Sequence, residues 1–128
     1  MQALAKELLP LVSTPASAGN RIAIVIESLS EFLSTPADPD LVALVKAARR
    51  NDHFVVGESE TSTWSQSWPL LLEFKSARRG FVLQPDPMEG DLLFKTSFPR
   101  FKRSEFPQGR GMLVQAGKAR RVQWASPE

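Results

Sequence analysis

Glu27 and Ser28 are two polar residues that directly follow an apolar run, residues 22–26 (IAIVI). The run is too short to span a membrane and is rich in β-branched residues, which predicts a strand buried on both faces, as in parallel sheets. Ligands of open α/β sheets bind beyond the carboxyl ends of the strands, so both residues would stand at a candidate active site. A Walker B segment has this form, and its acid helps to hold the magnesium of a bound nucleotide. A core strand that simply ends on an acid fits the same pattern.

Basic residues in the C-terminal half form a second group, interleaved with Phe98, Phe101 and Phe106. Lysine and arginine neutralise phosphates, and binding of this kind weakens steeply as salt rises. The sequence has no evident base-reading helix, so any contact with a nucleic acid is expected to ignore base sequence. A solvated basic face is the alternative. The candidates for DNA or partner contact are Arg100, Lys102, Arg103, Arg110, Lys118, Arg120 and Arg121.

Two tryptophans, Trp64 and Trp68, flank the end of a polar stretch over residues 58–67. Tryptophans are enriched at binding hot spots, so these two are candidates for a partner pocket, and core packing is the alternative. His53 is the one histidine of the chain and begins a short apolar run. Nothing in the sequence places a serine and an acid with it in a catalytic arrangement. No catalytic residue and no metal ligand are therefore assigned.

Composition limits the possible classes of protein. The chain has 128 residues, no cysteine and a net charge of +2. This length suits one domain, and the lack of cysteine excludes disulfides and thiolate metal sites. No apolar run approaches the length of a membrane span, so the chain is expected to be soluble and cytoplasmic, without inserting into a membrane itself. Any membrane association would come through segments outside this chain.

Periodicity places these residues on elements. Helical spacing of apolar residues predicts helices over 2–13 and 38–50, and short apolar runs predict strands over 22–26 and 53–57. Strand, helix and strand at this spacing make a βαβ unit with a parallel pair. Glu27 and the polar stretch that begins at residue 58 would then leave the same edge of the sheet.

The second half is expected to contain a helix over 68–75 and a strand over 81–84, with 92–106 irregular. Gly117 and Lys118 are a plausible hairpin turn between strands over 112–115 and 121–125. The fold class predicted is α/β, as one domain over residues 1–128. Its mixed sheet would be mostly parallel, flanked by helices, with an antiparallel C-terminal hairpin.

Several stretches in order resemble one family, the motor ATPases of the FtsK/SpoIIIE type, including EccC-like ATPases of type VII secretion. The resemblance is to the C-terminal part of the motor domain and covers most of the chain. In that family a hydrophobic strand runs directly into acidic residues, and residues 25–32 (VIESLSEF) resemble this pattern. The other matching stretches are 75–86 (KSARRGFVLQPD), 90–94 (GDLLF), 98–100 (FPR) and 106–114 (FPQGRGMLV).

The resemblance implies a RecA-like partial domain, the Walker-B-side portion of an ATP-driven translocase module. The chain has no Gly-x-x-x-x-Gly-Lys-Ser/Thr loop to hold phosphates, and it carries Ser28 where the family has its catalytic glutamate. Glu27 would stand in for the metal-side aspartate. The module is therefore expected to be degenerate and to hydrolyse no ATP alone. ATP and magnesium are cofactors of the family, and none is expected in this chain by itself.

Partners also follow from the resemblance. They are an upstream phosphate-loop half or neighbouring ATPase modules, double-stranded DNA, and, in the alternative function as a secretion-type module, a secreted peptide. An arginine can stabilise phosphoryl charge at a neighbouring subunit, and the ring-forming motors make Arg78 or Arg79 a candidate for that trans-acting role. Surface arginines that cap a helix C-terminus fit the same positions.

Overall fold

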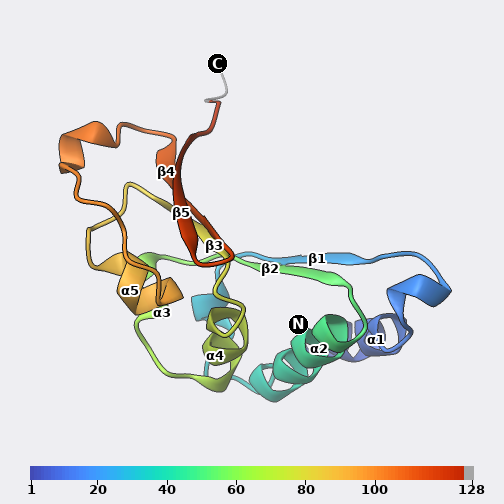
Figure 1. The fold of residues 1–128 in the computed structure, drawn as a ribbon. Helices are drawn as coiled ribbons and strands as arrows, with labels where there is room; N and C mark the ends of the chain where they lie inside the picture. The colour runs from blue at the N-terminus through green and yellow to red at the C-terminus, as the bar shows by residue number, and fades with distance from the viewer. Residues whose placement is uncertain (126–128) are drawn as a thin grey trace. The chain divides into compact units, whose positions relative to one another are not determined.

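A computed structural model describes residues 1–125 of the chain. Contacts between residues divide the chain into two compact units, Met1–Phe74 and Lys75–Glu128, called unit 1 and unit 2 below. Each unit has its own sheet, so each is described by itself (Figure 1). None of the helices in the described residues is long and apolar enough to cross a membrane.

Unit 1 follows the predicted order of helix, strand, helix and strand. Its elements are α1 (Gln2–Val12), β1 (Ala23–Ile26), α2 (Asp38–Arg50), β2 (Phe54–Gly57), α3 (Thr61–Trp64) and α4 (Pro69–Lys75). Strands β1 and β2 pair in parallel, in a register that runs from Ala23 opposite Phe54 to Ile26 opposite Gly57. The predicted βαβ unit is thus confirmed, because α2 provides the long crossover that a parallel pair needs.

The prediction that β1 is an interior strand buried on both faces is wrong. Among residues 1–125, the sheet of unit 1 has only β1 and β2, so each strand has one edge without a described neighbour. Ile24 and Ile26 face the helices, whereas Val25 is 65% exposed on the opposite face, where Phe54 of β2 is 52% exposed. An apolar β-branched run has the same composition whether one face or two are covered, so the sequence could not distinguish these cases.

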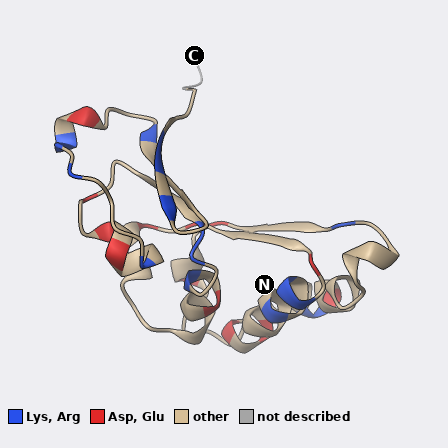
Figure 2. Cartoon of the chain, in the orientation of Figure 1, with Lys and Arg blue, Asp and Glu red and all other residues tan. Residues whose placement is uncertain are grey.

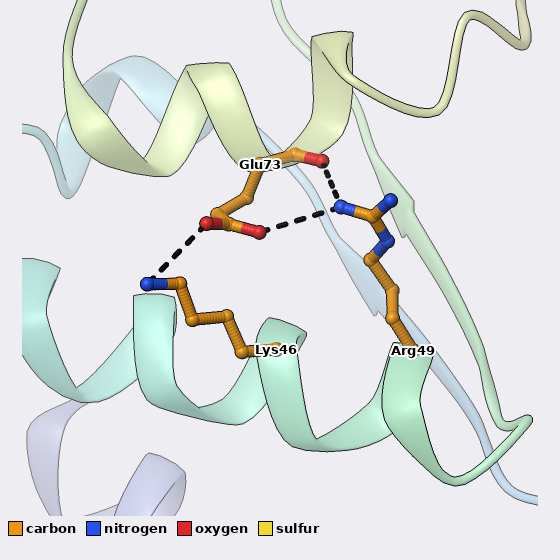
Figure 3. Close-up of polar contacts among 3 residues, drawn as sticks. All are labelled: Lys46, Arg49 and Glu73. Carbon is orange, nitrogen blue, oxygen red and sulfur yellow. Dashed lines mark hydrogen bonds and ion pairs between the residues drawn. The ribbon is translucent and has the colours of Figure 1, made fainter.

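The core of unit 1 lies between this sheet and its helices. Buried residues on one face of α2 pack with the buried residues of α1, and Leu29 and Leu70 complete the cluster. Ion pairs join α4 to α2 at the surface of the unit. The Glu73 carboxylate lies 3.6 Å from the Lys46 Nζ and 3.4 Å from a guanidinium nitrogen of Arg49 (Figure 3). Arg49 also donates to the backbone carbonyl of Glu73.

His53 joins the start of the sheet to the loop after α1. Its buried ring accepts the N–H of Ile22 at Nδ1 (3.1 Å), and Nε2 lies 2.6 Å from the carbonyl oxygen of Thr14. Because Nδ1 accepts, Nε2 carries the proton and donates. The histidine is therefore a structural group at the amino ends of the strands.

Unit 2 is built on an antiparallel sheet. Its elements are β3 (Gly80–Leu83), α5 (Glu89–Phe94), a 3-10 turn (Arg103–Glu105), β4 (Arg110–Gln115) and β5 (Lys118–Gln123). The strand order is β3-β4-β5, and the predicted C-terminal hairpin is confirmed. Ala116 and Gly117 both have positive φ at its turn, the conformation that matches the twist of paired strands. The predicted turn at Gly117 and Lys118 is wrong by one residue, because Lys118 already pairs with Gln115 and begins β5.

Two expectations for the second half are wrong. Strand β3 pairs with β4 in a separate sheet and does not extend the parallel pair, so no single mixed sheet forms. Residues 92–106 are not wholly irregular, because α5 reaches Phe94 and a 3-10 turn follows. The coarse α/β class holds, with one parallel and one antiparallel sheet.

The core of unit 2 is small. Val82, Phe106 and Met112 are its buried members, and partly buried phenylalanines surround them. Gly111 belongs to the fit between β3 and β4, because a Cβ there would collide with the Val82 carbonyl oxygen and would lie 2.8 Å from the Phe81 ring. Phe81 in turn meets the Trp124 ring edge to face, with centroids 5.4 Å apart.

Candidate functional site

The carboxyl ends of β1 and β2 meet at one edge of the sheet in unit 1. Ser28 has left-handed backbone angles (φ 50°, ψ 54°) and turns the chain immediately after β1. Its N–H donates to the Glu58 carboxylate (3.0 Å), and the Leu29 N–H donates to the Glu58 carbonyl oxygen (2.9 Å). The Glu58 N–H donates back to Ile26 (2.9 Å). Through these three hydrogen bonds, Glu58 fixes the turn that contains Glu27 and Ser28.

This edge carries carboxylate and hydroxyl groups without a histidine. Glu27 and Ser28 are exposed, and Glu27 forms no ion pair among the described residues. His53, the single histidine of the chain, precedes β2 and so lies at the opposite end of the strands. A serine hydroxyl needs a partner base to act as a nucleophile or base. Among residues 1–125, no three acidic or histidine side chains are grouped as metal ligands.

The two tryptophans proposed to line a partner pocket differ in burial. Trp64 packs edge to face on Phe74, with centroids 5.9 Å apart, and belongs to the partly buried shell of the unit 1 core. Its indole N–H donates to the Ser59 carbonyl oxygen (3.3 Å). Trp68 is 41% exposed, and its indole N–H donates to Gln66 (2.9 Å). Trp64 thus serves the core, and Trp68 retains a surface available to a partner.

Arg78 and Arg79 lie in the short segment between α4 and β3, and both are exposed. Arg78 has positive φ (49°), and its N–H donates to the Lys75 carbonyl oxygen (3.1 Å). Arg78 therefore ends α4 through its backbone N–H. Its side chain takes no part in this contact. Neither guanidinium forms an ion pair with a described residue.

Two of the basic candidates in unit 2 are held by neighbouring groups. Arg110 donates to the side chain of Gln123 (3.1 Å) and to the backbone carbonyl of Glu105 (3.1 Å). Arg121 lies over the ring of Phe106, 5.1 Å from its centroid, and 3.7 Å from the Glu105 carboxylate. These contacts tie the segment around Glu105 to the hairpin, so both arginines support the fold of unit 2.

The two arginines of β5, Arg120 and Arg121, do not share one face. Arg120 pairs with Leu113 across the hairpin, whereas Arg121 pairs with Met112, so the two arginines lie on opposite faces of the sheet. The remaining candidates are exposed: Arg100, Lys102, Arg103 and Lys118. Figure 2 colours the Lys and Arg positions blue along the chain.

Glu58 and Glu105 were not among the candidate residues, although each positions one of them. Glu58 could have been found from the sequence, because it follows β2 as Glu27 follows β1, and parallel strands bring such positions together. Glu105 has no comparable signal. Its contact with Arg121 joins residues far apart in the chain and depends on how the hairpin folds back.

The chain matches no protein-family model, no curated protein and no solved structure. The candidate site is therefore interpreted from its own residues and from the resemblance given above.

Proposed function

We propose that the chain is the Walker-B-side part of a degenerate ATP-driven translocase module of the FtsK/SpoIIIE type, working in the cytoplasm. It would contribute a strand that ends in Glu27 and Ser28, together with contacts to neighbouring subunits or to DNA. One observation carries the proposal: the β1–α2–β2 crossover brings Glu27, Ser28 and Glu58 to one edge of a parallel pair. Open α/β sheets bind ligands at that edge.

The chemistry of phosphoryl transfer explains why the chain would not act alone. Catalysis in this class needs backbone N–H groups and a lysine around the phosphates, magnesium, and a residue that orients the attacking water. The sequence has no phosphate-loop motif, and Ser28 occupies the position expected for the catalytic glutamate. Glu27 could therefore assist only with a nucleotide that another part of a module holds.

The proposed contacts outside the module use other residues. Arg78 and Arg79 would serve a neighbouring subunit's nucleotide, a role that suits exposed guanidinium groups without ion pairs to described residues. Arg100, Lys102, Arg103 and Arg120 would contact DNA phosphates. The alternative function, binding of a secreted peptide by a type VII secretion-like module, is favoured by the exposed ring of Trp68.

The experiment measures phosphate release and nucleotide binding. The purified chain with magnesium and ATP is expected to release no phosphate above a protein-free control. Mixed with the phosphate-loop half of an FtsK/SpoIIIE-type module, it is expected to associate and to raise that half's affinity for a fluorescent ATP analogue. Glu27→Ala should remove the gain, and Glu31→Ala, which alters an exposed acid beyond the strand end, should keep it.

Two results would contradict the proposal. Turnover by the chain alone that disappears in Glu27→Ala would show an independent ATPase. Failure to associate with any phosphate-loop half would remove the kinship on which the proposal depends.

A further inference from the structure

The sheet of unit 1 has an open edge along β1. The Phe54 N–H donates to the Ile22 carbonyl oxygen and the Glu58 N–H to that of Ile26, both at 2.9 Å, so the even-numbered residues of β1 turn towards β2. Backbone groups of successive strand residues point to opposite sides. The N–H and C=O of Val25 therefore point to the open edge, where no described strand pairs with them (Figure 1).

An apolar groove runs along this edge. It has a volume of about 320 Å³, and three successive residues of β1, 24–26, line it together with Glu27, which follows the strand, whereas no residue of β2 does. A groove that touches both faces of one strand but not its neighbour must follow the open side of that strand. Leu4 and Leu8 of α1, Phe32, and Leu41 and Leu44 of α2 form the opposite wall.

The groove carries one charged side chain, Glu27, at the carboxyl end of β1. This carboxylate is exposed and has no ion-pair partner among residues 1–125. Unit 1 as a whole has nine acidic and five basic side chains, a net charge of −4. The electrostatics at the end of the groove therefore favour a cation.

We propose that the β1 edge binds an extended peptide segment of a partner protein as a third strand. An apolar side chain of the peptide would enter the groove against Leu4 and Phe32, and a lysine or arginine would face Glu27. Strand addition of this kind takes affinity from main-chain hydrogen bonds and specificity from alternate side chains. Binding would be favourable for two reasons. A two-stranded sheet has little stability by itself, and a third strand adds backbone hydrogen bonds. The peptide would also cover apolar groove residues such as Leu4, which is 49% exposed.

This inference does not rest on the ATPase kinship. It uses the backbone of β1 and the groove, and it holds for any partner that supplies such a segment. The groove is also distinct from the exposed ring of Trp68 on which the alternative function depends, because neither Trp64 nor Trp68 lines it.

The probe is a short fluorescent peptide that alternates valine and threonine and ends in lysine, titrated by anisotropy. Val25→Pro removes the N–H that faces the open edge but none that faces β2, so it should abolish binding while circular dichroism stays unchanged. Val25→Ala keeps that N–H and is the matched control. Glu27→Gln should weaken binding about threefold, the size typical of an exposed ion pair, while Glu31→Gln should have no effect. A peptide with glutamine in place of lysine should bind both Glu27 forms equally.

Hydrogen exchange on the unmodified protein keeps the test decisive if Val25→Pro fails to fold. Saturating peptide should slow exchange at the amides of Ala23 and Val25, which face the edge. Absence of binding, or binding that leaves these amides unchanged, would overturn the proposal. A dimer in sedimentation that protects the same amides without peptide would also overturn it, because the occupant would then be a second copy of the chain.

Discussion

The two units reach a stable sheet by different means. Unit 1 covers one face of a parallel pair with helices, and ten buried residues form its core. In unit 2 the antiparallel sheet contributes to a cluster of three buried residues, of which Phe106 is the largest. Parallel strands need a helical crossover, so the chain that connects them also provides the cover. A hairpin needs only a turn, so the side chains that bury one face of its sheet must come from elsewhere in the chain. In unit 2 they are phenylalanines of the segment that precedes β4.

The units also differ in charge. Unit 1 has five basic and nine acidic residues, a net charge of −4, and unit 2 has eleven basic and five acidic residues, a net charge of +6, which together give the +2 of the chain. A chain that is nearly neutral overall therefore combines an acidic and a basic part. This difference suggests distinct partners, a cationic peptide for unit 1 and a polyanion for unit 2.

The largest effect is expected for Phe106→Ala, which removes the main side chain of the smaller core together with its contact to Arg121. Replacement of a buried phenylalanine by alanine costs about 3–5 kcal/mol. That is comparable to the whole stability expected for a unit of this size. Native-state hydrogen exchange should show β4 losing protection while α2 keeps it.

Leu44→Ala is the reciprocal control, because Leu44 is buried in the core of unit 1. It should cost about 2–5 kcal/mol and lower protection in α2 but not in β4. If both variants lowered protection equally in both units, the units would unfold together and the comparison of separate cores would fail.

A smaller loss is expected for His53→Ala. The substitution leaves the partly buried Ile22 N–H and the Thr14 carbonyl oxygen without their partner, and the loss of an ordinary hydrogen bond costs about 0.5–1.5 kcal/mol each. The free energy of unfolding from urea titration measures the change. Arg21→Ala removes an exposed ion pair with Asp52 nearby and should cost less than about 1 kcal/mol. Equal losses in the two variants would refute the structural role given to His53.

The smallest effect concerns DNA. Unit 2 should give the chain weak, sequence-independent affinity for duplex DNA, measured by anisotropy at low salt. Replacing Arg100, Lys102 and Arg103 together by alanine should lower the slope of log affinity against log salt by about 0.9 for each phosphate that the variant no longer neutralises. Lys6→Ala, in the acidic unit, should leave the slope unchanged. An unmodified chain that binds no duplex DNA at low salt would contradict the proposed interaction.

Much of the local structure could be predicted from the sequence. Helical spacing located α1 and α2, and the apolar runs before residues 27 and 58 located β1 and β2. Because a helical connection between two strands favours a parallel pair, the common edge of Glu27 and Glu58 was predictable as well. The C-terminal hairpin was predictable from its turn, since Gly117 suits a positive φ.

Which strands share a sheet was decided only by the tertiary structure. A short run such as β3 carries no information about its neighbour, and here it pairs with β4, where Gly111 allows the Phe81 ring to approach. The exposure of Val25 was equally hidden, because the composition of a strand does not reveal whether its second face or edge is covered. Secondary-structure propensity and hydrophobic periodicity depend on residues close together in the chain, so they can be predicted from the sequence. Pairing and burial depend on residues distant in the chain, so only the folded arrangement fixes them.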